Sequence, residues 1–133
     1  MPLKTPATEL SPEVMFDPAC GLLSMEGECY PENAVAFFAP LLAEMKCALT
    51  VGTQKAISAA FRLRYVNSAS SRALRRVLVL LDTFAREGGH VVVRWHHEQD
   101  DEVSEELGKE LIADLHFIEA SCETQGAEAG VPV

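Results

Sequence analysis

The most regular pattern in the chain is the alternation of apolar and polar positions over residues 56–66. A period of two predicts a β-strand with one buried face. Residues 90–96 predict a second strand, and their continuous apolar centre is typical of a strand buried on both faces. The apolar positions expected on the buried face of the first strand are Ile57, Ala59, Phe61, Leu63 and Tyr65.

Three segments carry apolar residues at the spacing of three and four that is typical of an amphipathic helix. The first begins at residues 30–33 (Tyr-Pro-Glu-Asn), is expected to kink or restart at Pro40, and ends before Gly52. The second covers residues 70–86 and is stopped by a Gly-Gly pair. The third follows a turn at residues 99–102. Its predicted inward stripe is Val103, Leu107, Leu111 and Leu115.

The remaining elements are short strands near the two ends of the chain. Two strand-like runs around Asp17-Pro18 predict a hairpin, and residues 117–120 predict a last strand. The resulting order, β-β-α-β-α-β-α-β, predicts an α/β fold with a mixed or mostly parallel sheet and helices packed on it. A chain of 133 residues predicts one domain. We expect a loose arm (1–11), the domain (12–122) and a disordered tail (123–133).

Composition and charge narrow the classes of function. With 48% apolar and 23% charged residues, the chain has the profile of an ordinary folded domain. A formal net charge of −9 disfavours nucleic acid and anionic lipid as general partners. No apolar run approaches the ~20 residues of a membrane span, and the first residues lack the apolar core of a signal peptide. A cytoplasmic protein with reduced cysteines is therefore expected.

Charge is distributed unevenly along the chain. Residues 55–94 contain eight basic and two acidic residues, whereas residues 98–114 contain eight acidic residues and one lysine. One interpretation is that the basic segment forms a single basic face that steers acidic partners. The alternative is that Arg75 and Arg76 belong to an ordinary solvated helix face.

Hydroxyl side chains are concentrated where the first strand gives way to the second helix, in the run Asn67-Ser68-Ala69-Ser70-Ser71. Sites in α/β sheets cluster at strand ends, and a hydroxyl there lies beside the unpaired N–H groups of the first helical turn. Asn and Ser are also good N-caps. The residues by themselves leave two functions open: helix capping, and a hydroxyl that is modified or binds a partner.

Other chemistry finds little support in the sequence. His96 and His97 are neighbours on a strand and point to opposite faces, so they do not share a metal ion easily. None of the four cysteines forms a C-x-x-C pair or lies in a recognisable activating context. We expect no cofactor and no metal. A small enzyme that uses His96 or a cysteine is a minor alternative.

Three motifs stand in order between residues 27 and 102 and together resemble one family. They are Gly27-Glu28-Cys29-Tyr30-Pro31-Glu32-Asn33, Tyr65-Val66-Asn67-Ser68-Ala69-Ser70-Ser71-Arg72, and Trp95-His96-His97-Glu98 followed by Asp100-Asp101-Glu102. The chain resembles the SiaC-like regulatory phosphoproteins, bacterial proteins related in fold to the STAS-type anti-sigma-factor antagonists. The resemblance implies a STAS-like α/β domain that is not itself an enzyme.

The resemblance also implies a phosphorylation site. In that family the strand–helix junction reads Tyr-x-Asn-Thr-Ser-Ser-x-Lys, and the threonine is the regulatory acceptor. Counted from Asn67, the acceptor corresponds to Ser68, and Ala69 stands where the family has a serine; Ser70 and Ser71 stay open as alternatives. The switch loop and interaction surface predicted around the acceptor comprise Tyr65, Asn67, Ser70, Ser71, Arg72, Arg75 and Arg76.

Three partners are implied by the same resemblance. A Ser/Thr kinase of histidine-kinase-like fold phosphorylates the acceptor, and a PP2C-type phosphatase removes the phosphate. The unphosphorylated form binds and activates a diguanylate cyclase, which links the switch to cyclic-di-GMP and biofilm formation. The alternative within this class is an anti-sigma-factor antagonist that binds a kinase-type anti-sigma factor.

Overall fold

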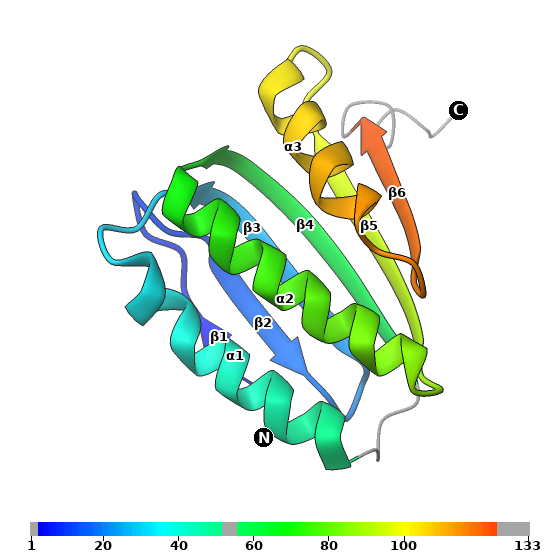
Figure 1. Ribbon diagram of the computed structural model, residues 1–133. Coiled ribbons are helices and arrows are strands. Elements are labelled where there is room, and N and C mark those ends of the chain that lie inside the picture. Colours follow the sequence, from blue (N-terminus) through cyan, green and yellow to red (C-terminus); the bar gives the residue numbers. More distant parts are fainter. Residues whose placement is uncertain (1–2, 52–55, 125–133) are drawn as a thin grey trace.

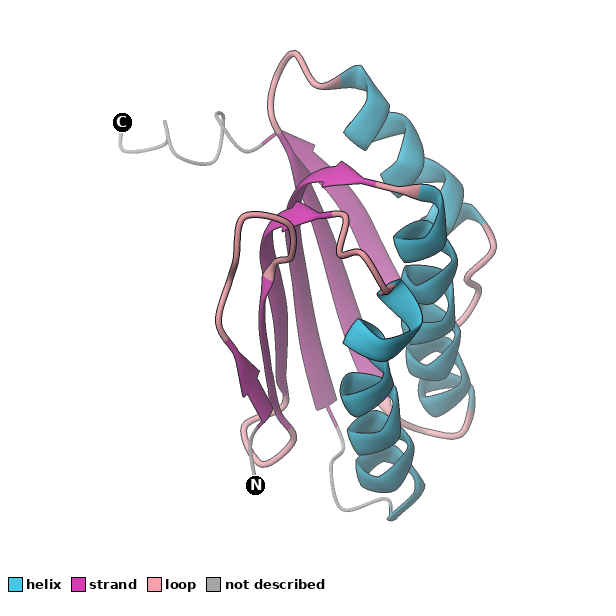
Figure 2. Cartoon of the chain, turned by 90° about the vertical axis from the view of Figure 1, so that its left-hand side faces the viewer, coloured by secondary structure: helices cyan, strands magenta, loops and turns pink. Residues whose placement is uncertain are grey.

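The computed structural model describes residues 3–51 and 56–124, which form a six-stranded sheet with three helices on one of its faces (Figures 1 and 2). In chain order the elements are β1 (Leu3–Thr5), β2 (Glu13–Asp17), β3 (Leu22–Cys29), α1 (Ala34–Val51), β4 (Ala56–Val66), α2 (Ser68–Arg86), β5 (His90–His97), α3 (Glu102–Ala113) and β6 (Glu119–Thr124). The predicted α/β class and the hairpin of β2 and β3 are confirmed.

The strands lie in the sheet in the order in which they occur in the chain. β1, β2 and β3 pair antiparallel, and β3, β4, β5 and β6 pair parallel. Each helix connects two neighbouring parallel strands, and the three crossovers step in one direction across the sheet. Crossovers of the same hand that step in one direction place their helices on the same face, as Figure 2 shows.

One covered face explains the burial pattern of the central strands. In β4 the predicted inward residues from Ile57 to Leu63 are at most 2% exposed. In β5 the prediction of burial on both faces is correct at His96, which is 1% exposed on the uncovered face, and wrong at Arg94. Val91, Val93 and Trp95 are each 1% exposed beneath the helices, whereas Arg94 is exposed on the opposite face. Within the described residues no helix covers that face.

The N-terminal segment is not the loose arm that the sequence predicts. Residues 3–5 form β1, which pairs with β2 and places Leu3 opposite Phe16. Leu3 also packs against the core. A strand of three residues is too short to show periodicity, and short edge strands of this kind are common because they limit pairing with other chains.

The C-terminal boundary also differs from the prediction. The last strand begins at Glu119 and runs to Thr124, so residues 123 and 124 of the predicted tail are strand residues. They pair in register with His96 and His97 of β5. This pairing depends on a partner strand that is remote in sequence. The rest of the predicted tail, residues 125–133, lies outside the described residues.

Helices α1 and α2 follow the sequence prediction closely. α1 continues through Pro40 as one helix, so the helix does not restart there. The side chain of Asn33 accepts a hydrogen bond from the backbone N–H of Ala36 at 3.1 Å. α2 is followed by Gly88, whose φ of 110° lies in the left-handed region that favours glycine.

In helix α3 the predicted inward stripe is correct at Leu107, Leu111 and Leu115, which lie in or against the core, and wrong at Val103. The buried residues of the helix are Ser104, Gly108 and Leu111, whereas Val103 is 80% exposed. A Cβ atom on Gly108 would lie 2.4 Å from Cδ1 of Trp95, so only glycine allows this approach. The indole Nε1 of Trp95 donates to the backbone oxygen of Ser104 at 3.0 Å. Ser104 and Gly108 therefore share the packing face of α3 with Leu111, because these small residues fit around the indole ring.

Candidate functional site: the carboxyl edge of the parallel strands

The three sequence motifs meet at one edge of the sheet. The carboxyl ends of β3, β4 and β5 lie there together with the N-termini of α1, α2 and α3 (Figure 1). The backbone N–H of Asn67 donates to the carbonyl oxygen of Cys29 at 3.2 Å. The rings of Tyr30 and Tyr65 pack edge to face with centroids 5.0 Å apart. The first motif is thus a direct neighbour of the second.

A register irregularity turns the end of β4 outward. Gly27 is opposite Leu63, but Cys29 is opposite Val66, so β4 contains one more residue than β3 over this stretch. Such a bulge breaks the alternation of a strand and re-aims its side chains. Tyr65 is consequently 58% exposed, and its assignment to the buried face of the strand is wrong.

Asn67 is the N-cap of α2. Its φ and ψ are −80° and 171°, and its Oδ1 atom accepts a hydrogen bond from the backbone N–H of Ser70 at 2.9 Å. The helix therefore begins at Ser68, two residues before the predicted start. Since Asn67 supplies the cap, the exposed hydroxyl of Ser68 is not needed for that role.

We expect Asn67→Ala to lower the free energy of unfolding by about 1 kcal/mol, because the first turn of α2 loses its side-chain acceptor. Urea unfolding followed by circular dichroism measures this change. The matched control is Ser68→Ala, which alters the next residue and leaves the cap in place. An equal loss in both variants would contradict the assignment of the cap.

The three serines of the junction differ in accessibility. Ser68 is exposed and Ser71 is partly buried, but Ser70 is fully buried. Burial raises the pKa of the adjacent Cys29 thiol to about 11, and the Ser70 hydroxyl opposes that shift. At neutral pH this thiol is therefore protonated and a poor nucleophile.

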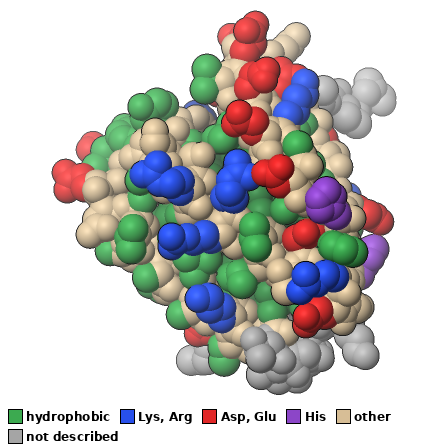
Figure 3. Space-filling view, in the orientation of Figure 1, with side chains coloured by type: hydrophobic (Ala, Val, Ile, Leu, Met, Phe, Trp, Pro, Cys, Tyr) green, Lys and Arg blue, Asp and Glu red, His purple; other side chains and the backbone are tan. Residues whose placement is uncertain are grey.

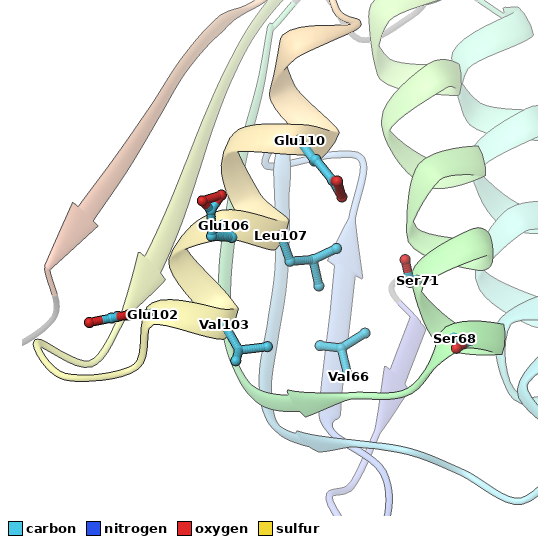
Figure 4. Close-up of a pocket in the computed structure, with 8 residues that line it drawn as sticks. All are labelled: Val66, Ser68, Ser71, Glu102, Val103, Glu106, Leu107 and Glu110. Atoms are coloured by element: carbon cyan, nitrogen blue, oxygen red, sulfur yellow. The ribbon is translucent and has the colours of Figure 1, made fainter.

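A groove of about 510 Å³ lies between α2 and α3 at this edge. Figure 4 shows Val66 and Val103 pointing toward one another, with Leu107 behind them and the two serines on α2. Glu110 points toward α2, whereas the other two glutamates point away from it. The lining residues are Val66, Ser68, Ser71, Glu102, Val103, Glu106, Leu107 and Glu110.

Sequence reasoning missed the α3 side of this groove. Val103 and Leu107 fit a helical core stripe, and the glutamates fit a solvated face. The feature of the sequence that could have indicated the packing face of α3 is the pair of small residues Ser104 and Gly108, four positions apart. That face turns Val103 toward α2 and leaves it exposed.

The uneven charge count suggested one continuous basic face. The structure instead divides the basic residues between two faces of the molecule. Arg72, Arg75 and Arg76 are exposed on α2. Arg64 and Arg94 lie on strands, on the sheet face away from the helices, where Arg64 forms an ion pair with Glu28 at 2.9 Å. The alternation of side chains across a strand thus divides the basic segment between two sides of the molecule.

The remaining candidate residues are not brought together. His97 Nδ1 lies 3.0 Å from the carbonyl oxygen of Glu98, while His96 approaches Glu123 at 3.9 Å from the opposite face of β5. Among residues 3–51 and 56–124 there is no cluster of three His, Cys, Asp or Glu side chains that could hold a metal ion. Over the same residues, no helix combines the length and apolar character of a membrane span.

The chain is thus a mixed α/β domain with an exposed hydroxyl, that of Ser68, at the carboxyl edge of its parallel strands. A family model described as SiaC family regulatory phosphoprotein matches residues 5–124. The chain belongs to this family, and it is a regulatory protein, not an enzyme.

Known proteins resemble this chain in sequence or in structure along most of its length. An uncharacterized protein of Pseudomonas aeruginosa strain UCBPP-PA14 is 33% identical over 115 residues, which cover 86% of this chain and 90% of that protein. The structure of SiaC of Pseudomonas aeruginosa has a TM-score of 0.82 at 29% identity and covers 92% of this chain and 98% of its own. A crystal structure of the diguanylate cyclase SiaD in complex with its activator SiaC from the same organism has a TM-score of 0.85 at 30% identity, with coverage of 92% and 99%.

Proposed function

We propose that this protein is a phosphorylation-switched adaptor whose unphosphorylated form binds and activates a diguanylate cyclase. A Ser/Thr kinase of histidine-kinase-like fold and a PP2C-type phosphatase act on Ser68. The observation that carries the proposal is the position of Ser68, which is exposed, uninvolved in capping, and part of the groove between α2 and α3. The similarity to SiaC in its complex with a cyclase supports this partner over a kinase-type anti-sigma factor.

The surface around Ser68 has the character of a protein-binding site. Three large apolar side chains at this edge are strongly exposed: Val35 at 73%, Tyr65 at 58% and Val103 at 80%. Exposed apolar side chains that gather beside a groove are typical of protein interaction sites. They come from the starts of α1 and α3 and from the end of β4, so they surround the start of α2.

A phosphate at Ser68 would change this surface without unfolding the domain. It adds about −1.5 to −2 charges at pH 7, and the N–H groups and positive dipole end of α2 favour an anion there. The unfavourable effect falls on the partner, which would have to dehydrate a dianion against an apolar surface. Glu110, which points toward α2, adds negative charge to the same groove.

The proposal predicts one phosphate on Ser68 after treatment with the cognate kinase. Ser70 has no exposed surface, so a kinase does not reach its hydroxyl in the folded chain. Phosphopeptide mapping by mass spectrometry identifies the acceptor, and Ser68→Ala should abolish incorporation. Ser71→Ala is the matched control and should be phosphorylated as the unmutated chain is. Phosphate that persists in Ser68→Ala would contradict the assignment.

A further inference from the structure

A second groove lies on the other side of α2, between α1 and α2, with a volume of about 520 Å³. It shares no lining residue with the groove at Ser68. Three of its lining residues are apolar and four are cationic. They are Leu42, Val79 and Leu80, and Lys46, Arg72, Arg75 and Arg76.

The charge of this groove is opposite to that of the whole chain. The protein carries a formal charge of −9, yet the polar residues that line the groove are all basic. In Figure 3 the Lys and Arg side chains gather over α1 and α2, with apolar surface between them, and acidic side chains gather over α3. Arg75 forms an ion pair with Asp114, in which Nη1 of the arginine lies 2.6 Å from Oδ2 of the aspartate. Within the described residues, neither Arg72 nor Arg76 forms an ion pair with a carboxylate.

The apolar part of the groove restricts the kind of partner. Val79 is 50% exposed, and Leu42 and Leu80 are partly buried beside it. Nucleic acid would offer a phosphate backbone, which leaves these side chains without apolar contacts. An anionic membrane would also meet the acidic surface of α3, which lies on the same side of the sheet.

We propose that the groove between α1 and α2 docks an amphipathic helix of a partner protein, with acidic residues flanking its apolar stripe. Leucine-like side chains of that helix contact Leu42, Val79 and Leu80, and its carboxylates lie against the basic rim. Docking of an apolar helix face into a groove is a recurrent mode of peptide recognition. The inference goes beyond the proposed function, because it concerns a different surface and does not depend on phosphorylation.

The test uses a synthetic fluorescent peptide of about 18 residues, five helical turns, with leucine at alternating spacings of three and four and glutamate on both flanks. Binding to the full chain is measured by fluorescence anisotropy. Lys46→Glu combined with Arg76→Glu should weaken binding by roughly tenfold or more, since two attractive charges become repulsive. Arg86→Glu is the control, because it reverses one charge near the end of α2, outside the groove.

The apolar contact is tested separately. Val79→Ser should weaken binding several-fold, whereas Leu22→Ser, which alters an exposed leucine of β3 outside both grooves, should not. All five substituted side chains are exposed, so the variants should fold, and circular dichroism checks this.

Several outcomes would overturn the inference: no binding of the peptide to the unmutated chain, an equal loss with Arg86→Glu, or equal binding of a peptide in which lysine replaces glutamate. Tighter binding of a DNA duplex or of phosphatidylglycerol vesicles than of the peptide would also contradict it. These results leave the role of Ser68 intact, because none of the variants touches the groove in which it lies.

Discussion

Ser68→Asp is expected to weaken binding of the diguanylate cyclase about a hundredfold, which corresponds to about 2.8 kcal/mol. The carboxylate places a permanent charge among the exposed side chains of Tyr65 and Val103, where the partner would otherwise make apolar contacts. The fold should tolerate the change, because an acidic residue in the first turn of a helix is stabilised by the helix dipole. The melting temperature should therefore stay within a few degrees of that of the unmutated chain.

Isothermal titration calorimetry with the purified cyclase measures the affinity, and differential scanning calorimetry measures the melting temperature. Ser68→Ala is the matched control and should bind as the unmutated chain does. Normal cyclase binding by Ser68→Asp would contradict the switch. A large drop in its melting temperature would show instead that Ser68 is a structural residue.

Gly108→Ala is expected to lower the free energy of unfolding by about 2 kcal/mol, a fall in melting temperature of about 8 °C for a domain of this size. The new Cβ would lie 2.4 Å from Cδ1 of Trp95. The indole ring has little freedom to move, because it stacks on the ring of Phe61 with centroids 5.8 Å apart. It also donates a hydrogen bond to the backbone oxygen of Ser104. The overlap outweighs the gain of up to about 1 kcal/mol from the higher helix propensity of alanine.

Guanidinium unfolding followed by circular dichroism measures this loss, and it also reports on variants that lack Trp95, the one tryptophan of the chain. A double-mutant cycle provides the control. In a Trp95→Leu background the same Gly108→Ala change should cost much less, because the smaller side chain leaves room for the methyl group. An equal cost in both backgrounds would show that the destabilisation does not arise from contact with the indole.

Local patterns in the sequence were sufficient for most of the elements. The alternation over residues 56–66 predicted β4, since a strand with one covered face imposes a period of two along its own length. The spacing of three and four predicted α1 and α2, and glycine marked the end of α2. The resemblance of the three motifs predicted the family, which the family match confirms.

Features that depend on remote neighbours were not predictable in this way. β1 exists because β2 offers a pairing edge, and β6 extends to Thr124 because it pairs with β5. Tyr65 is exposed because a bulge between β3 and β4 breaks the alternation. The packing face of α3 is set by the fit of Gly108 against Trp95, which no helical periodicity shows.

The sequence by itself determined the kind of protein and the short stretch that contains the candidate acceptor, because capping residues and motifs are local properties of the chain. The tertiary structure alone decided which serine is accessible: Ser68 is exposed and Ser70 is buried against Cys29. It also decided that acidic and basic grooves lie on opposite sides of α2. Exposure and charge at a surface depend on how separate elements pack, and that packing brings together residues that are far apart in the chain.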